Sequence, residues 1–101
     1  MSFAKRTDAN QIEVVKDLRK ALPECRVFVA SGTGDGFPDL VVGWNGYNFL
    51  FEVKDPEKPA SKRSLTDAQK EFHGSWQGQA SVVHSAAEIC AEIARYIHKH
   101  K

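Results

Sequence analysis

The chain has 101 residues, 42% of them hydrophobic, and a formal net charge of +1 at pH 7. This length favours a single domain over residues 1–101 with one compact core, and leaves no room for a separate recognition domain. The near-neutral total gives no signal of nucleic-acid binding, and no run of about 18 apolar residues predicts a membrane span. Cys25 and Cys90 lack a metal-binding spacing and no signal-peptide pattern is present, so we expect reduced thiols in a cytoplasmic protein.

The first predicted element is a helix that runs to about Leu22, with Thr7 or Asp8 as its cap and Pro23 after its end. We expect the residues before it, 1–6, to be flexible. At about 100° per residue, Gln11 falls near the middle of the apolar stripe of this helix. Two interpretations stay open for it. Gln11 is either a buried amide bonded to a neighbouring strand or a helix-borne ligand that faces a site.

Three strands are predicted next. The first covers residues 26–31, and a glycine-rich loop at 32–37 lets the backbone turn sharply. The segment 38–54 contains two apolar runs that flank Asn45-Gly46, the strongest short-range signal for a two-residue hairpin turn. Both faces of this hairpin are apolar, which predicts a sheet covered on both sides, as in α/β folds.

The hairpin register predicts an acid pair. Residues that face each other have numbers that sum to 91, so Trp44 faces Tyr47 and Asp39 faces Glu52. Two carboxylates at that separation repel unless something offsets the repulsion, and a hard divalent cation does so. Lys54 emerges on the same strand face as Glu52. The pattern predicts a metal-dependent site for phosphodiester hydrolysis; the alternative is a strand-starting Asp39 and an edge salt bridge.

The segment after the hairpin begins with a polar loop at 55–64. A helix then starts at Thr66, whose spacing to Gln69 is that of a capping box. It is expected to run to about Trp76, with Gly78 as its C-terminal cap.

A fourth strand is predicted at 79–84, and Ser85 caps a last helix with Glu88 three residues further on. Residues 98–101 are expected to form a tail. The predicted order is α-β-β-β-α-β-α, an α/β fold with a mixed central sheet flanked by helices.

Three polar residues near the acid pair have more than one interpretation. Gln69 is explained by its cap role alone, but it can also steer Lys54 or a phosphate. Asp35 is a second metal ligand or, as is common for Asp beside Gly, part of a turn. His73 is a base or, more commonly, a surface or packing residue.

Four segments together resemble a known family: GDGFPDLVVG, FLFEVKD, SLTDAQKEFHGSW and SVVHS. They are similar to the virus-type replication-repair nuclease domain, VRR-NUC, a branch of the PD-(D/E)XK nuclease superfamily. The resemblance extends from about Asp8 to the last helix. It implies a restriction-endonuclease-like core with the element order predicted above.

The resemblance also implies roles for individual residues. Asp39 and Glu52 would be metal ligands, with the carbonyl group of Val53 as a third. Lys54 would orient or activate the attacking water and stabilise the charge of the transition state. Gln69 would match the glutamine that follows the lysine strand in this family.

At the position of Gln11 the superfamily often has Glu. Because glutamine is neutral and binds metals more weakly, this departure bears on the number and affinity of bound metals. Asp8 lies close in helical angle and is a candidate to compensate.

The function implied is that of a Mg²⁺- or Mn²⁺-dependent, structure-specific DNA endonuclease that acts on branched DNA, similar to Holliday-junction resolvases. Family members of this minimal size are often phage-encoded, serve DNA repair and work as homodimers. Lys58, Lys62 and Arg63 would grip phosphates beside the site, although such a cluster is more commonly a solvated face. The alternative is a DNA-binding module on a nuclease fold that is non-catalytic or needs a partner protein.

Overall fold

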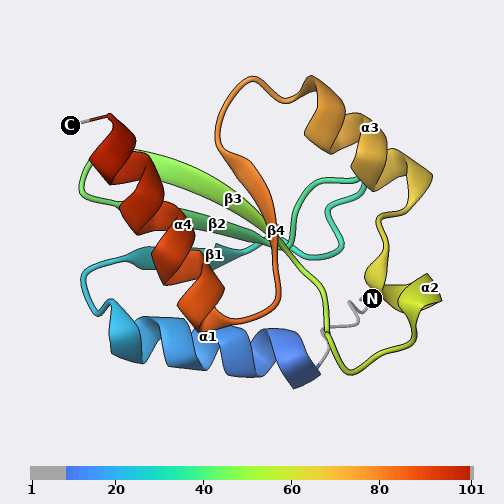
Figure 1. Cartoon of the computed structure of the whole chain (residues 1–101), viewed down its shortest axis with the longest axis horizontal. Coiled ribbons are helices and arrows are strands. Elements are labelled where there is room, and N and C mark those ends of the chain that lie inside the picture. Colours follow the sequence, from blue (N-terminus) through green and yellow to red (C-terminus); the bar gives the residue numbers. More distant parts are fainter. Residues whose placement is uncertain (1–8, 101) are drawn as a thin grey trace.

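The computed structural model describes residues 9–100 (Figure 1). Along this part of the chain the elements are α1 (Ala9–Ala21), β1 (Arg26–Val29), β2 (Leu40–Trp44), β3 (Tyr47–Val53), α2 (Ala60–Arg63), α3 (Asp67–Ser75), β4 (Ala80–Val83) and α4 (Ala86–Lys99). The predicted order is confirmed, with one addition. The segment expected to be loop throughout contains the one-turn helix α2.

The two chain ends differ from expectation or lie outside the described part. The flexible start at 1–6 and the candidate caps Thr7 and Asp8 fall outside the described residues. The tail predicted at 98–101 is wrong for its first residues, because α4 continues to Lys99 and His100 is its C-cap. Among residues 9–100, no helix is long and apolar enough to cross a membrane.

The four strands form one open, mixed sheet in the order β1-β2-β3-β4. The first three are antiparallel neighbours, and β4 lies parallel to β3 at the far edge. The sequence between β3 and β4 contains α2 and α3, as a parallel connection requires. The chain therefore has an α/β fold.

The hairpin turn is the one predicted. Asn45 and Gly46 both have positive φ angles, 51° and 87°, as a type I′ turn needs. Trp44 pairs with Tyr47, and the register continues to Leu40 opposite Phe51. One further step along both strands reaches the two acids of the predicted pair.

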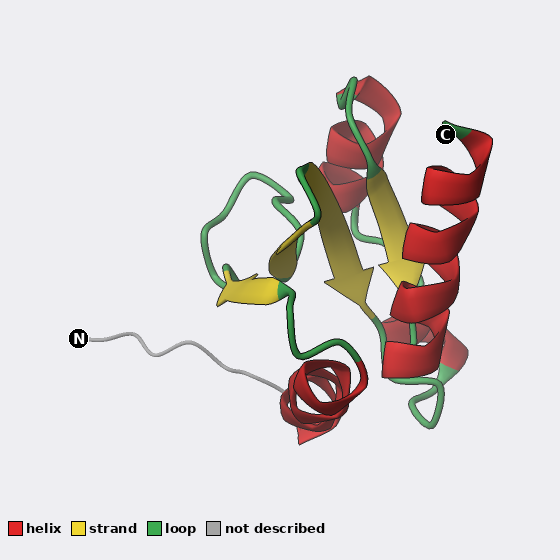
Figure 2. Cartoon of the chain, turned by 90° about the vertical axis from the view of Figure 1, so that its left-hand side faces the viewer, coloured by secondary structure: helices red, strands yellow, loops and turns green. Residues whose placement is uncertain are grey.

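One face of the sheet carries the core. Figures 1 and 2 show α1 and α4 lying against the same side of the sheet. The buried apolar residues from the strands and from these two helices form one cluster: Val14, Val15, Leu18, Val27, Leu40, Val42, Phe49, Phe51, Val53, Val83, Ala86, Ile89 and Ile93. Strand alternation sends the intervening residues of β3 to the opposite face.

The opposite face is only partly covered. Leu50 is buried there, but Phe28 on β1 and Val82 on β4 are 65% and 37% exposed. The prediction of a sheet covered on both sides is therefore wrong at its two edge strands. The glycine-rich loop lies on this side and is held close to α3, because a Cβ at Gly36 would overlap the carbonyl group of Ala68.

The predicted start of α3 and its predicted end near Trp76 are confirmed, but the predicted C-cap at Gly78 is wrong. Thr66 and Gln69 form the complete capping box. The C-cap is Trp76, which has an extended backbone, so the chain leaves α3 without a left-handed glycine. Gly78 instead lies beneath the Trp76 indole, where a Cβ would be 2.9 Å from Nε1.

Candidate active site

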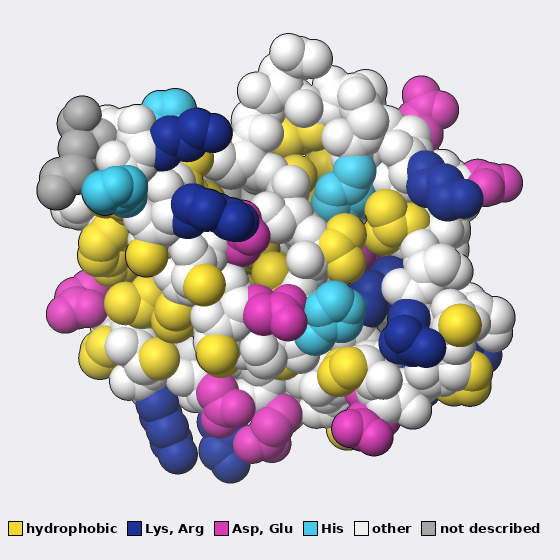
Figure 3. Space-filling view, in the orientation of Figure 1, with side chains coloured by type: hydrophobic (Ala, Val, Ile, Leu, Met, Phe, Trp, Pro, Cys, Tyr) yellow, Lys and Arg dark blue, Asp and Glu magenta, His cyan; other side chains and the backbone are white. Residues whose placement is uncertain are grey.

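A polar cleft of about 250 Å³ opens where β2 and β3 meet the first turn of α1. Together with Asp55, its lining includes seven of the residues singled out in the sequence: Gln11, Asp39, Glu52, Val53, Lys54, Lys58 and Lys62. Figure 3 shows some of the Lys and Arg side chains on the α2 side of the molecule and others near the C-terminal end and along the lower edge of the view. The topology therefore brings residues from three separate segments to one cleft.

The acid pair forms the centre of the cleft. Glu52 is 3% exposed, and its Oε1 atom is buried without a hydrogen-bond partner in the described structure. Asp39 is held in place because its Oδ2 accepts a hydrogen bond of 2.9 Å from the Val53 backbone N–H. Burial, followed by the neighbouring Asp39 carboxylate, raises the pKa of Glu52 to about 8.

Gln69 connects the helix α3 to the acid and the lysine of the site. Its Oε1 accepts hydrogen bonds from Lys54 Nζ at 3.0 Å and from the Thr66 backbone N–H at 2.9 Å. Its Nε2 donates to Glu52 Oε2 at 3.0 Å. The two interpretations of Gln69 thus describe one side chain that caps α3 and positions Lys54. Lys54 Nζ lies 3.7 Å from Glu52 Oε2 and completes the network.

Gln11 satisfies parts of both of its interpretations. It is 5% exposed, and its Nε2 donates a hydrogen bond of 2.8 Å to the Ser31 hydroxyl group, just after β1. It also lines the cleft, to which it can offer its carbonyl oxygen. The neighbouring Asn10 donates from Nδ2 to the Lys54 carbonyl at 3.4 Å, which ties α1 to the end of β3.

The three predicted phosphate contacts lie in two different settings. Lys58 and Lys62 line the cleft and are exposed, so their ammonium groups border the acid pair. Arg63 does not line it. Its Nε donates to the Lys58 carbonyl at 2.7 Å, so Arg63 braces the loop that carries Lys58.

Two of the weaker candidates also have clear positions. Asp35 has φ 58° and lies against α3 beside Asp67, outside the cleft lining, as expected of a turn residue. His73 lies one turn after Gln69, and its Nε2 is buried without a described partner. Burial and the Lys54 ammonium group lower the pKa of His73. The four-residue spacing from Gln69 was the available sequence signal for this position.

The donor set bears on which metal the cleft can hold. Among residues 9–100 no group of three or more His, Cys, Asp or Glu is placed to bind an ion. Two carboxylates suit Mg²⁺, which is commonly held by one or two carboxylates, several waters and substrate phosphates. The unpartnered Oε1 of Glu52 and the high pKa of this carboxyl are the features that a bound cation would relieve.

Comparison of the chain with models of protein families, with curated proteins and with solved structures found no match.

Proposed function

We propose that this chain is a metal-dependent DNA endonuclease of the PD-(D/E)XK type that hydrolyses phosphodiester bonds in branched DNA. The observation that carries the proposal is the acid pair beside Lys54, in which Glu52 is buried and Asp39 is half-buried. The resemblance to VRR-NUC, and with it a restriction-endonuclease-like core, is a further support. The resemblance and the cleft involve the same residues, and the fold adds that these residues lie together in space.

The acid pair is costly to stability without a cation. A buried carboxylate next to a second carboxylate is desolvated and repelled, so its charged form is disfavoured. A merely structural pair would be relieved by replacing either acid. The arrangement makes physical sense if Asp39 and Glu52 hold Mg²⁺ or Mn²⁺, with the Val53 carbonyl as a third ligand. Such an ion would polarise the scissile phosphate and lower the pKa of a bound water.

The remaining residues of the site have distinct proposed tasks. Lys54 is restrained by Gln69 and points its ammonium group toward the acids, where it can hold a water in line or donate to developing negative charge. Gln69 is a positioning residue, because it contacts both Lys54 and Glu52. Lys58 and Lys62 would hold the DNA backbone next to the cleft.

One observation favours the alternative of a DNA-binding module that is inactive alone. Gln11 engages Ser31 with its amide nitrogen, so it supplies the cleft with at most a neutral oxygen. A site with two carboxylates binds a metal weakly until substrate phosphates add ligands. A chain of this kind could therefore need a partner protein, or a second copy in a homodimer, for full activity.

The experiment is cleavage of labelled four-way junction, flap, splayed-arm and linear duplex DNA by the purified protein with Mg²⁺ or Mn²⁺. Lys54→Ala and Glu52→Gln serve as matched controls. We expect metal-dependent cutting near the branch that both controls lose. Cutting that persists in Glu52→Gln would reject this site. Tight binding of branched DNA by the wild-type protein without cutting would favour the binding module.

A further inference from the structure

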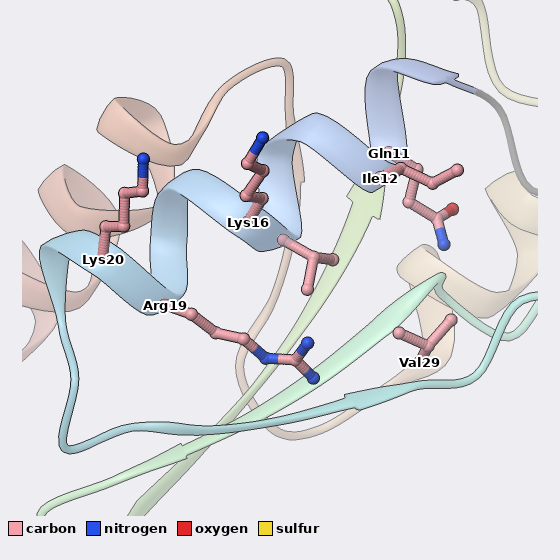
Figure 4. Close-up of a pocket in the computed structure, with 7 residues that line it drawn as sticks. Gln11, Ile12, Lys16, Arg19, Lys20 and Val29 are labelled. Carbon is pink, nitrogen blue, oxygen red and sulfur yellow. The ribbon is translucent and has the colours of Figure 1, made fainter.

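A second hollow lies next to the cleft, between α1 and the edge strand β1. This α1–β1 groove has a volume of about 420 Å³ and is lined by Gln11, Ile12, Val15, Lys16, Arg19, Lys20 and Val29. Figure 4 shows the residues of α1 standing above the edge strand, with Gln11 and Ile12 at one end of the groove. Because Gln11 lines both hollows, the groove lies directly beside the candidate active site.

Three cations line the part of the groove beyond Gln11 and Ile12. In Figure 4 the Arg19 side chain reaches toward β1, whereas the Lys16 and Lys20 ammonium groups point away from it. Lys16, Arg19 and Lys20 follow Gln11 along α1, at rises of roughly 7 to 14 Å from it at 1.5 Å per residue. None of the three ion pairs found between described residues includes them. The two acids of α1, Glu13 and Asp17, do not line the groove. A chain of negative charges that leaves the acid cleft past Gln11 would meet these three cations in turn.

The floor of the groove is apolar. Ile12 and Val29 are 57% and 43% exposed there, which leaves aliphatic surface open beside the cations. Arg19 crosses from α1 toward β1 in Figure 4 and donates from a guanidinium nitrogen to the Val27 carbonyl at 3.4 Å. A guanidinium plane held in this way presents a flat cationic surface on which a base can stack.

The exposed edge of β1 limits which kind of molecule can bind in the α1–β1 groove. The Ala30 N–H bonds the Asp39 carbonyl, so alternate residues of β1 pair with β2 while Val27 and Val29 direct their backbone groups outward. Arg19 covers one of these outward groups, which blocks strand addition by a peptide. The groove is of a size that suits a single unpaired DNA strand, whereas a double helix about 20 Å wide cannot enter it.

Resting on the proposed function, we infer that the α1–β1 groove binds a single-stranded DNA arm that continues from the scissile phosphate. Phosphates of the arm contact Lys16 and Lys20, and an unstacked base packs on Arg19 and on the apolar floor. The groove thereby selects substrates with an unpaired strand beside the cut, such as splayed arms and flaps, over blunt duplex.

The test measures binding of a labelled splayed-arm DNA and of a blunt duplex with the same paired sequence, in EDTA so that no cleavage occurs. The main variant is Lys16→Ala/Lys20→Ala. Its matched control is Arg95→Ala/Lys99→Ala, which removes two exposed cations from α4. Alanine is a strong helix former, so both variants are expected to fold.

We expect the main variant to weaken splayed-arm binding about tenfold and to lower the log–log salt slope by about 1.4, since each single-strand contact contributes about 0.7. Duplex binding by the same variant, and both substrates with the α4 control, should change less than about twofold. Arg19→Lys keeps the charge but removes the guanidinium plane, so it should weaken arm binding and leave the salt slope unchanged.

Equal weakening of arm and duplex, or no change in either, would overturn the inference. A shift of oligomeric state in the main variant without loss of arm binding would identify the groove as an interface between copies and would also overturn it. The proposed function fails separately. If the wild-type protein binds arms through the groove but never cuts DNA with metal present, the inference about the groove stands and the proposed nuclease function is rejected.

Discussion

The two faces of β3 carry residues of opposite consequence for stability. Phe49, Phe51 and Val53 point into the core against α1 and α4, where burial of apolar surface stabilises the fold. Glu52, on the same strand, points to the other face, where its carboxyl group is buried with that of Asp39 nearby, and Lys54 follows just after the strand. Strand β3 thus stabilises the fold with its core-facing residues, whereas the burial of Glu52 on its other face opposes folding.

This difference between the two faces of β3 indicates which residues of a small domain are candidates for function. Core residues are explained by packing, and replacing them costs stability. The acid pair has no such explanation, because burying Glu52 next to Asp39 opposes folding at neutral pH. A group that lowers stability while neighbouring side chains hold it in place is a candidate for chemistry.

The largest expected effect is on cleavage. Asp39→Asn and Glu52→Gln keep the size of each side chain and remove the charge that binds the metal. We expect each to lower the cleavage rate of branched DNA by about 10³-fold or more, since a metal contributes several kcal/mol to the transition state. Binding of the same DNA in EDTA, measured in parallel, should stay within about threefold of wild type.

The core side of the comparison is tested with Phe51→Ala, which removes a fully buried ring next to Glu52 in sequence. We expect the free energy of unfolding to fall by about 3–5 kcal/mol, measured by urea denaturation. Residual folded protein should still cut in the presence of Mg²⁺. A Phe51→Ala protein that is fully folded and inactive would mean that the two faces are not separable.

The role of Gln69 is tested against that of its cap. Gln69→Leu removes the bonds to Lys54 and Glu52 and half of the capping box, and should lower the cleavage rate about 10–100-fold. Thr66→Ala is the matched control, because it breaks the same capping box and leaves the bonds to the site. It should lower stability by about 1 kcal/mol with little effect on cleavage. If Gln69→Leu and Thr66→Ala lose the same cleavage activity, Gln69 acts only as a cap residue.

The smallest expected effect is a dependence of stability on pH. The pKa of Glu52 is about 8 when folded, above the ordinary value of 4.5. Between these values the folded state binds more protons than the unfolded state, so stability falls as pH rises through this window. Metal-free wild-type protein should therefore melt a few degrees lower near pH 8 than near pH 5.5, and Glu52→Gln should reduce that difference. An unchanged difference in the variant would assign the effect to other groups.

Much of the site could be predicted because local rules determine it. The turn at Asn45-Gly46 sets the hairpin register, and the register alone places Asp39 next to Glu52. The helical period likewise placed Gln11 on the buried side of α1. In each case the relevant residues are close in sequence or belong to one element.

The remainder depends on contacts between distant segments. The sequence left two roles open for Gln69, as a cap or as a residue that steers Lys54. That one side chain has both roles and also bonds Glu52 depends on the packing of α3 against the glycine-rich loop at Gly36, about thirty residues earlier in the chain. No local pattern reports such a contact. Gly78 was assigned to a helix cap by its spacing, whereas in the structure it lies against the Trp76 indole, whose Nε1 is 2.9 Å from where a Cβ would be. The α1–β1 groove also needs two elements to be placed side by side.

The most direct measurement is the unfolding temperature near pH 8 with and without millimolar Mg²⁺, for wild type and Glu52→Gln. If the acid pair is a metal site, Mg²⁺ should raise the melting temperature of the wild-type protein by binding the folded state, and the variant should lose this response. No Mg²⁺-dependent shift in the wild-type protein, or the same shift in both proteins, would contradict the assignment of Asp39 and Glu52 as the metal site.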